Sequence, residues 1–223
     1  MSDAQVSIDP QQAIALAVEV VVFTTRGSAL EVLVVRRGSG RPRLPGALVG
    51  VNEELDRAAV RALRSELGLE APVRQFHAFG GVTRDPSMRI ISIGYMAVAP
   101  LREIEPILNE ERELASVGPA GLRSRTGRKL TLALDHGAIV EEAVRDLRLN
   151  LDHTRFAFGL VAREFSLREL QEVHEAIRGR PLNKPAFRKR LLESGWLEST
   201  GRRETDKGFR PAELYRARSE PRR

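Results

Sequence analysis

The chain has 223 residues, of which 42% are hydrophobic and 30% are charged, and it contains no cysteine. A chain of this size and apolar content can bury a core without cross-links. The absence of cysteine excludes disulfides, thiol nucleophiles and cysteine-based zinc sites. The four histidines are too scattered along the sequence to indicate a metal cluster, so we predict no metal site.

The net charge of +6 is concentrated in the last third of the chain. Residues 1–150 carry 19 Lys and Arg and 19 Asp and Glu, whereas residues 151–223 carry 17 and 11. Such an asymmetry indicates an acidic partner for the last third, and nucleic acid is the leading candidate. A solvated basic face without a partner is the alternative.

No segment predicts a membrane span or a secretory signal. The longest apolar run, Ala13 to Phe23, has about half the required length and contains Glu19. The first residues lack the basic start of a signal peptide. We therefore expect a soluble cytoplasmic protein with no membrane partner.

The first 150 residues predict an α/β unit. A valine-rich segment from Ala15 to Thr25 predicts a buried strand, and Gly27-Ser28 turns the chain into a second strand from Leu30 to Arg37. The further elements expected are a helix at Leu55–Leu67, strands at Val73–Val82 and Ile90–Val98, an irregular stretch over 103–128, and a helix to about Leu149 with Asp135 as N-cap. Strands and helices in this order predict an α/β/α sandwich with a mixed sheet.

Residues 46–69 resemble a Nudix box that has lost part of its metal site. The residues that match the family pattern are Glu53, Arg61, Leu63, Glu66, Gly68 and Leu69. Ala47 stands where the family has its leading glycine, and Ala62 and Ser65 stand in place of two carboxylates. Positions 62, 65 and 66 share one helical face. Three carboxylates on such a face would hold divalent cations against a diphosphate. Since that face offers only Glu66, we predict a domain that binds a nucleotide without cutting it and has no catalytic residue.

The alternative is an ordinary amphipathic helix that ends at Gly68. Its apolar stripe, which faces the core in either case, comprises Leu55, Ala59, Leu63 and Leu67.

The sequence from residue 151 onward predicts a winged helix-turn-helix. Ser166-Leu-Arg-Glu169 is a capping box that starts a helix to about Ile177. Asn183 then caps a second helix from Lys184 to about Ser194, in which Phe187, Leu191 and Leu192 are candidates to face inward. Strands near Leu197–Gly201 and Ala212–Arg216 flank a basic tip. We therefore divide the chain into a Nudix-like domain for ligand sensing and dimerisation, 1–150, and a winged helix-turn-helix DNA-binding domain, 151–223.

Cationic side chains on the second helix and the hairpin are suited to duplex DNA. The predicted DNA-binding residues are Asn183, Lys184, Arg188, Lys189, Arg203, Lys207 and Arg210. Long cationic side chains reach phosphates, and arginine also pairs with guanine. The amide of Asn183 suits adenine, although its role as N-cap is an equal alternative. Trp196 is expected to pack between helix and hairpin rather than to stack on a base.

Several further motifs occur in a fixed order and spacing over about residues 12–217. They are Leu44-Pro45-Gly46 with the incomplete box, Thr83-Arg84-Asp85-Pro86, Leu132-Ala-Leu-Asp135-His136, Phe165 to Gln171, Glu175 to Leu182, Phe187-Arg-Lys and Arg210 to Tyr215. With these motifs, nearly the whole chain resembles the Nudix-related transcriptional regulators of NAD metabolism. The resemblance implies a repressor of NAD synthesis or salvage genes that binds palindromic operator DNA as a homodimer. It also implies an effector, ADP-ribose or a related NAD-derived nucleotide, in the Nudix-like domain, with no cofactor required.

The ligand-binding residues predicted for this effector are Arg36, Arg37, Glu66 and Arg84. The three arginines are placed to contact the diphosphate, and structural ion pairs are the alternative for each. Two other functions remain open at this point. One is a pyrophosphohydrolase that acts on ADP-ribose-type substrates through Glu66, and the other is a scaffold whose basic region binds acidic proteins.

Overall fold

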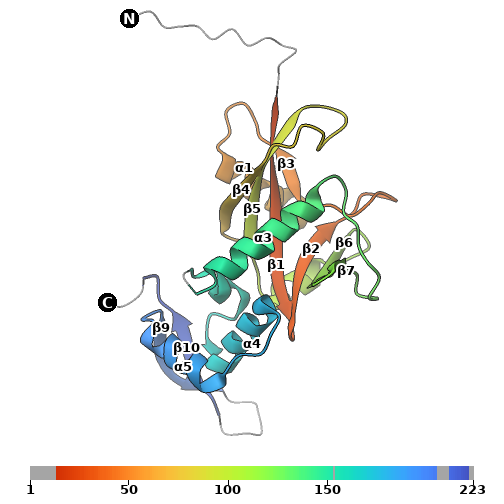
Figure 1. Ribbon diagram of the computed structural model, residues 1–223. Coiled ribbons are helices and arrows are strands. Elements are labelled where there is room, and N and C mark those ends of the chain that lie inside the picture. The colour runs from red at the N-terminus through yellow and green to blue at the C-terminus, as the bar shows by residue number, and fades with distance from the viewer. Residues whose placement is uncertain (1–13, 153, 205–210, 221–223) are drawn as a thin grey trace, which may run out of the picture.

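The structure of the protein is a computed structural model that describes residues 14–152, 154–204 and 211–220 (Figure 1). Its strands are β1 (Ala15–Arg26), β2 (Ala29–Val35), β3 (Gly46–Leu48), β4 (Val73–Phe79), β5 (Ile90–Val98), β6 (Arg112–Gly118), β7 (Gly121–Arg123), β8 (Phe165–Ser166), β9 (Leu197–Arg203) and β10 (Glu213–Ala217). Its helices are α1 (Leu55–Leu67), α2 (Leu101–Ile104), α3 (His136–Asn150), α4 (Leu167–Arg178) and α5 (Lys184–Glu193), with 3-10 turns η2 (Glu105–Ile107) and η3 (Phe156–Leu160). None of the described helices is long and apolar enough to cross a membrane.

A seven-stranded mixed sheet forms the centre of the first unit. Its order is β4-β5-β1-β2-β6-β7, and β3 pairs separately with β1. Strands β1 and β5 run parallel over Ala15–Phe23, whereas the other pairs are antiparallel. The predicted mixed sheet is therefore confirmed.

Alternating side chains of β1 supply both layers of the sandwich. Val18, Val20 and Val22 are buried in the cluster that also contains α1, whereas Val21 and Phe23 are buried in the cluster that contains α3. Successive residues of a strand point to opposite faces, so a continuous valine run can fill two cores. Figure 1 shows α3 lying across the sheet with its C-terminal end near the second unit.

Helix α1 has the bounds that the sequence predicts and ends at Gly68, whose φ of 67° is the left-handed conformation favoured by glycine. Ala59, Leu63 and Leu67 are buried as expected, and Leu55 packs at the edge of the same cluster. Ala62 is also fully buried, whereas Ser65 is exposed. The helical face that would carry the metal ligands therefore begins inside the core.

The prediction of an irregular stretch over 103–128 is wrong, because β6 and β7 extend the sheet there. Strand β6 pairs with β2 from Val35↔Arg112 to Glu31↔Ser116. Strand β6 begins with charged residues, and only Leu114 and Ala115 are buried, so its sequence lacks the alternating apolar pattern of a strand. The pairing with β2 determines this strand more than local propensity does.

Several predicted boundaries and contacts also differ from the structure. Strand β2 ends at Val35 and β4 at Phe79, whereas β9 continues to Arg203. Asp135 precedes α3, but its side chain accepts no capping hydrogen bond from the helix backbone, because its carboxylate accepts hydrogen bonds from Arg84. Leu192 is 52% exposed and does not face inward.

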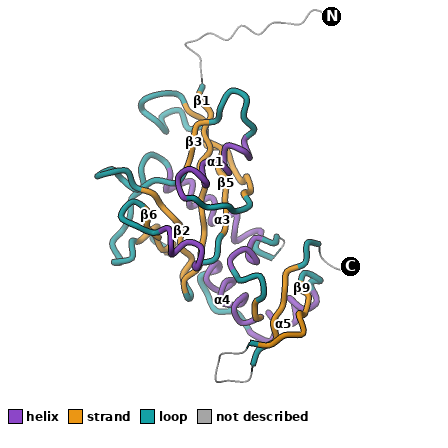
Figure 2. Tube along the Cα trace, turned by 180° about the vertical axis from the view of Figure 1, so that it is seen from behind, coloured by secondary structure: helices purple, strands orange, loops and turns teal. Residues whose placement is uncertain are grey.

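The second unit has the element order of a winged helix. Strands β8, β10 and β9 form a three-stranded sheet in that order, and α4 and α5 come between β8 and β9 along the chain. Figure 2 shows α4, α5 and β9 in this unit. Ser166 and Glu169 form both hydrogen bonds of the predicted capping box. The side chain of Asn183 accepts a hydrogen bond from the Ala186 amide at 3.0 Å, so its role as N-cap is confirmed.

The two units share one continuous hydrophobic cluster. Leu170, Val173 and Ile177 of α4 are buried in the cluster that also contains Val32 and Val34 of β2. The second unit is therefore packed against the sandwich and is not joined to it by a flexible linker alone. A shift of one unit relative to the other requires this shared core to repack.

Candidate nucleic-acid interface and ligand site

Helix α5 presents its polar face to solvent because only two of its side chains are buried. Phe187 and Leu191 dock the helix onto the winged-helix core. Lys184 and Arg188, which are four residues apart, lie together on an exposed face. Arg190 points elsewhere, because it pairs with Asp152 at 3.3 Å and lies over the Phe187 ring.

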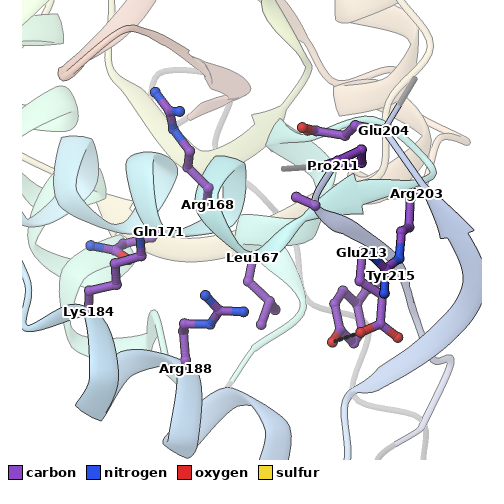
Figure 3. A pocket seen from close by; sticks show the side chains of 11 residues that line it. Leu167, Arg168, Gln171, Lys184, Arg188, Arg203, Glu204, Pro211, Glu213 and Tyr215 are labelled. Carbon is purple, nitrogen blue, oxygen red and sulfur yellow. Dashed lines mark hydrogen bonds between the residues drawn. The ribbon is translucent and has the colours of Figure 1, made fainter. Parts of the chain in front are cut away.

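A groove of about 430 Å³ lies between α5 and the part of the hairpin where β9 ends and β10 begins (Figure 3). Lys184 and Arg188 line it from α5, and Arg203 lines it from β9. Helix α4 contributes Arg168 and Gln171. The structure thus places together three predicted DNA-binding residues that are separated by up to 19 positions in the sequence.

The groove contains four cationic side chains and two carboxylates, Glu204 and Glu213. Hydrogen bonds from Ser199 and Tyr215 lower the pKa of Glu213, so this carboxylate is ionised and held against β9 and β10. Among the described residues, Lys184, Arg188 and Arg203 have no ion pair. Their charges are therefore available to an anionic ligand.

The remaining predicted DNA-binding residues have different positions. Lys189 is exposed, lies 4.0 Å from Glu193 and does not line the groove. Asn183 is exposed but uses its side-chain oxygen as the cap of α5. Lys207 and Arg210 lie outside the described residues. Trp196 is half-buried beside the turn between α5 and β9.

A second polar hollow of about 180 Å³ lies at the C-terminal end of α1. Arg36, Arg37 and Glu66, three of the four predicted ligand residues, line it together with Arg43 and Arg112. One oxygen of Glu66 accepts hydrogen bonds from Arg37 at 3.1 Å and from Arg43 at 2.6 Å. The carboxylate that would hold a metal ion is thus engaged by two guanidinium groups.

The charge of this hollow favours a phosphate group over a cation. Arg37 has 78% of its side chain exposed, so its guanidinium can approach a ligand. Arg36 pairs with Glu113 at 2.9 Å and donates to the Gly40 carbonyl. No cluster of three potential His, Asp or Glu metal ligands occurs among the residues that the structure describes.

Arg84, the fourth predicted ligand residue, is a buried structural residue in this structure. It donates two hydrogen bonds to Asp135, at 2.9 and 2.8 Å, and only 3% of its side chain is exposed. This bidentate pair joins the loop after β4 to the start of α3. Contact between Arg84 and a diphosphate would require this pair to open.

Glu19 is a functional candidate that is not among the residues predicted from the sequence. Its side chain is 12% exposed, its Oε2 atom has no hydrogen-bond partner, and it lies 3.9 Å from His136 Nδ1. Burial raises the pKa of Glu19 to about 8, although nearby Arg84 and Arg43 oppose this effect. The carboxyl group is therefore mostly protonated at neutral pH. A charged residue within a valine-rich strand was the available signal in the sequence.

Gly46 explains how this carboxyl group fits beneath the box loop. A Cβ atom at position 46 would lie 2.2 Å from Glu19 Oε2. His136 accepts a hydrogen bond from the Leu44 amide at 3.0 Å, and burial lowers its pKa to about 4. The loop before α1, strand β1 and the start of α3 therefore meet at one buried polar cluster.

An ion pair between Glu53 and Arg61, two residues that match the Nudix box pattern, holds the loop before α1 in place. Arg61 contacts both oxygens of Glu53, at 2.6 and 2.7 Å, and also donates to the Leu48 carbonyl. Glu53 in turn accepts a hydrogen bond from the Gly50 amide at 2.9 Å. The Arg61 guanidinium holds the pKa of Glu53 at about 2. These contacts assign Glu53 a structural position in this chain.

These features define a class of protein that combines an α/β/α sandwich with a winged helix. The chain belongs to the Nudix family, since the profile of the NUDIX domain matches residues 14–128. The profile described as the NrtR DNA-binding winged helix domain matches residues 157–217.

Two similar proteins match the chain across both parts. The ADPR responsive transcriptional repressor NtrR of Acinetobacter baylyi is 29% identical over 210 residues, which cover 90% of this chain and 81% of the relative. The crystal structure of Shewanella oneidensis NrtR complexed with a 27mer DNA has 25% identity and a TM-score of 0.79, with coverage of 91% and 93% of the two chains.

A further structure shares the fold of the sandwich. The NUDIX domain of Shewanella oneidensis NrtR complexed with ADP ribose is 24% identical, with a TM-score of 0.51, and covers 66% of this chain. The predicted fold class, a Nudix-type sandwich followed by a winged helix, is confirmed by these similarities.

Proposed function

We propose that this protein is a transcriptional repressor that binds duplex DNA through the α5 groove and responds to ADP-ribose bound in the Nudix domain. The cationic groove between α5 and the hairpin is the observation that carries the proposal. The similarity of this chain to an ADPR responsive transcriptional repressor supports ADP-ribose as the effector, and its similarity to a structure complexed with DNA supports DNA binding. In its narrower form, the proposal is that the protein controls genes for NAD synthesis or salvage and that its effector is ADP-ribose or a related NAD-derived nucleotide.

Helix α3 is the physical link between effector and DNA in this proposal. It has 15 residues and is about 22 Å long. Its start is bound to Arg84 through Asp135 and to the Leu44 amide through His136. Near its other end, Arg148 donates to the Ile177 carbonyl at 2.8 Å.

Asp152, just beyond α3, extends this link to α5, which is the helix proposed to contact DNA. Its carboxylate pairs with Arg178 of α4 at 2.6 Å and with Arg190 of α5 at 3.3 Å. A ligand that moves the start of α3 therefore changes the support of both helices. Such a ligand favours whichever arrangement it binds more tightly.

A homodimer is part of the proposal because the winged helix of one chain covers only a short stretch of duplex DNA. Two copies on a palindromic site supply useful affinity. Sedimentation of the protein with and without duplex DNA measures this state directly. A single copy bound to each operator would contradict the dimer.

DNA fragments selected from the genome by the full-length protein test the main proposal. We expect a common palindromic sequence and a change in its enrichment when ADP-ribose is added. The sign of this change identifies whether the effector releases or favours DNA. Failure to bind any duplex at low salt would refute the proposal, since the non-specific phosphate contribution is strongest there.

We expect Arg37→Ala to weaken ADP-ribose binding by roughly 5- to 20-fold, because it removes one charge-assisted contact to the diphosphate. Arg37 is mostly exposed, so its removal leaves the core intact. Isothermal titration calorimetry gives the dissociation constant. Arg128→Ala is the matched control, since Arg128 is exposed and lies outside the hollow. Equal affinities of the Arg37 and Arg128 variants would exclude this contact.

A pyrophosphohydrolase is the second candidate function because Glu66 is retained. We expect no turnover of ADP-ribose with Mg²⁺ or Mn²⁺, since Arg37 and Arg43 engage Glu66 and positions 62 and 65 lack carboxylates. Phosphorus NMR of the incubated mixture detects the two monophosphate products. Turnover that Glu66→Gln abolishes would make this protein an enzyme.

A further inference from the structure

A second cavity, here called the junction cavity, lies between the sandwich and the winged helix and has a volume of about 870 Å³. Val73, Val98 and Arg102 belong to its sandwich wall. Phe156, Phe158 and Val161 form the wall contributed by η3 and the segment after it, and β10 contributes Arg216 and Ala217. The cavity is separate from both the α5 groove and the hollow beside α1, with which it shares no lining residue.

The interior of the junction cavity is apolar and partly aromatic. The Phe158 ring stacks on Phe165 with centroids 5.9 Å apart, and Phe156 packs beneath the Arg74 guanidinium. Phe156, Phe158 and Val161 are only half-buried in the structure. Apolar surface of this kind, in a cavity within the range of about 300–1,000 Å³, is typical of small-molecule sites.

Cationic groups surround this apolar surface. Five arginines line the cavity against two glutamates. Arg74 pairs with Asp146 and Arg216 with Glu164, so these two arginines are neutralised by protein carboxylates. Arg155 and Arg163 are exposed, and within the described part of the chain neither has an ion pair. They give the mouth of the cavity an unbalanced positive charge.

The backbone at one wall is held close to the sheet. A Cβ atom at Gly159 would lie 2.5 Å from Val98 Cγ2, so η3 approaches the end of β5 because residue 159 is glycine. The walls come from the sandwich, from η3 and from β10, and the shape of the cavity therefore depends on how the two units are placed.

We infer that the junction cavity is a second binding site, for an organic anion with an apolar or aromatic body and one sulfonate, carboxylate or phosphate group. The body packs against Phe156, Phe158 and Val161, and the anionic group pairs with Arg155 and Arg163. A ligand bound there touches both units and favours one placement of the winged helix. That last consequence rests on the proposed function, whereas the binding itself does not.

The fluorescent probe 8-anilinonaphthalene-1-sulfonate tests this site on the full-length protein, because it combines an aromatic body with one sulfonate. We expect a saturable signal with one site per chain that excess ADP-ribose does not displace. The double variant Arg155→Glu/Arg163→Glu is expected to weaken binding at least 10-fold. Arg125→Glu/Arg128→Glu is the matched control, since it makes the same charge change at exposed residues outside the cavity.

A filling variant provides an independent test. Ala162→Trp places a large ring at the cavity wall, at a half-exposed position, and is expected to abolish the signal while the melting temperature stays near that of the wild type.

Equal probe affinity in both double variants, displacement of the probe by ADP-ribose, or binding retained in Ala162→Trp would overturn the inference. Normal binding of DNA and ADP-ribose together with one of these outcomes would refute the junction site alone. The expected probe binding without any DNA binding would refute only the proposed function.

Discussion

Replacing Lys184, Arg188 and Arg203 together by alanine is expected to weaken binding to a selected operator by on the order of 100-fold at moderate salt. The three side chains line one groove and have no ion pair among the described residues. A contact to a phosphate contributes on the order of 1 kcal/mol, and about 3 kcal/mol corresponds to about a 100-fold change in affinity. Fluorescence anisotropy with labelled duplex measures the effect.

The salt dependence separates a local contact from a general effect of net charge. The triple variant is expected to reduce the slope of log K against log salt by about 3, because three phosphate contacts release fewer counterions. Arg188→Ala alone is expected to lose about 5-fold, with dimer formation unchanged. Arg125→Ala/Arg128→Ala/Lys129→Ala removes the same charge from an exposed loop of the sandwich. Equal losses in the two triple variants would show that the groove is not the DNA-binding surface.

Glu19→Gln is expected to stabilise the protein at neutral pH by on the order of 3 kcal/mol. Burial raises the pKa of Glu19 from 4.5 to about 8 in the folded protein. Between these values the unfolded chain releases its proton first, so the wild type loses stability as the pH rises from 4.5 to 8. A glutamine cannot ionise and removes this loss. Near pH 4.5 the two proteins are expected to be equally stable.

Urea unfolding at pH 5, 7 and 8.5 measures the difference. Glu110→Gln is the control, because Glu110 is an exposed glutamate far from the buried cluster in sequence and makes no ion pair within the described chain. Parallel pH profiles of the wild type and Glu19→Gln would show that Glu19 ionises in the folded protein as it does in the unfolded chain.

His136 has the opposite dependence on pH. Burial lowers its pKa from 6.5 to about 4. Below pH 6.5 the unfolded chain takes up a proton before the folded protein does, so this histidine removes stability as the pH falls toward 4. Glu19→Gln, Glu110→Gln and the wild type are all expected to keep this loss of stability at acid pH, which distinguishes it from the effect of Glu19.

Local patterns predicted most elements of the fold. The bounds of α1 and β5 and the capping box of α4 match the sequence prediction, because helix period, strand composition and capping residues act within a few positions. Strand β6 was missed because its pairing with β2 determines it. Three predicted DNA-binding residues meet at one groove because the helix and hairpin that carry them were identified correctly.

The fold brings together only some of the residues predicted for the ligand site. Arg36, Arg37 and Glu66 line one hollow, but Arg84 is tied to Asp135, 51 positions further along the chain. Arg43 and Glu19 were not selected, although Arg43 engages Glu66 and Glu19 lies beneath the box loop. Their roles depend on burial and on partners far away in the sequence.

Residue order by itself determined the two-part architecture, the loss of two box carboxylates and the excess positive charge of the last third. Each of these depends on composition or on spacing within one element. The tertiary structure alone decided which arginines are free, which carboxyl group is buried without a partner, and that the two units share a core with a cavity at their junction. Ion pairing and desolvation depend on distance and burial in three dimensions, and neither quantity is contained in the spacing of residues along the chain.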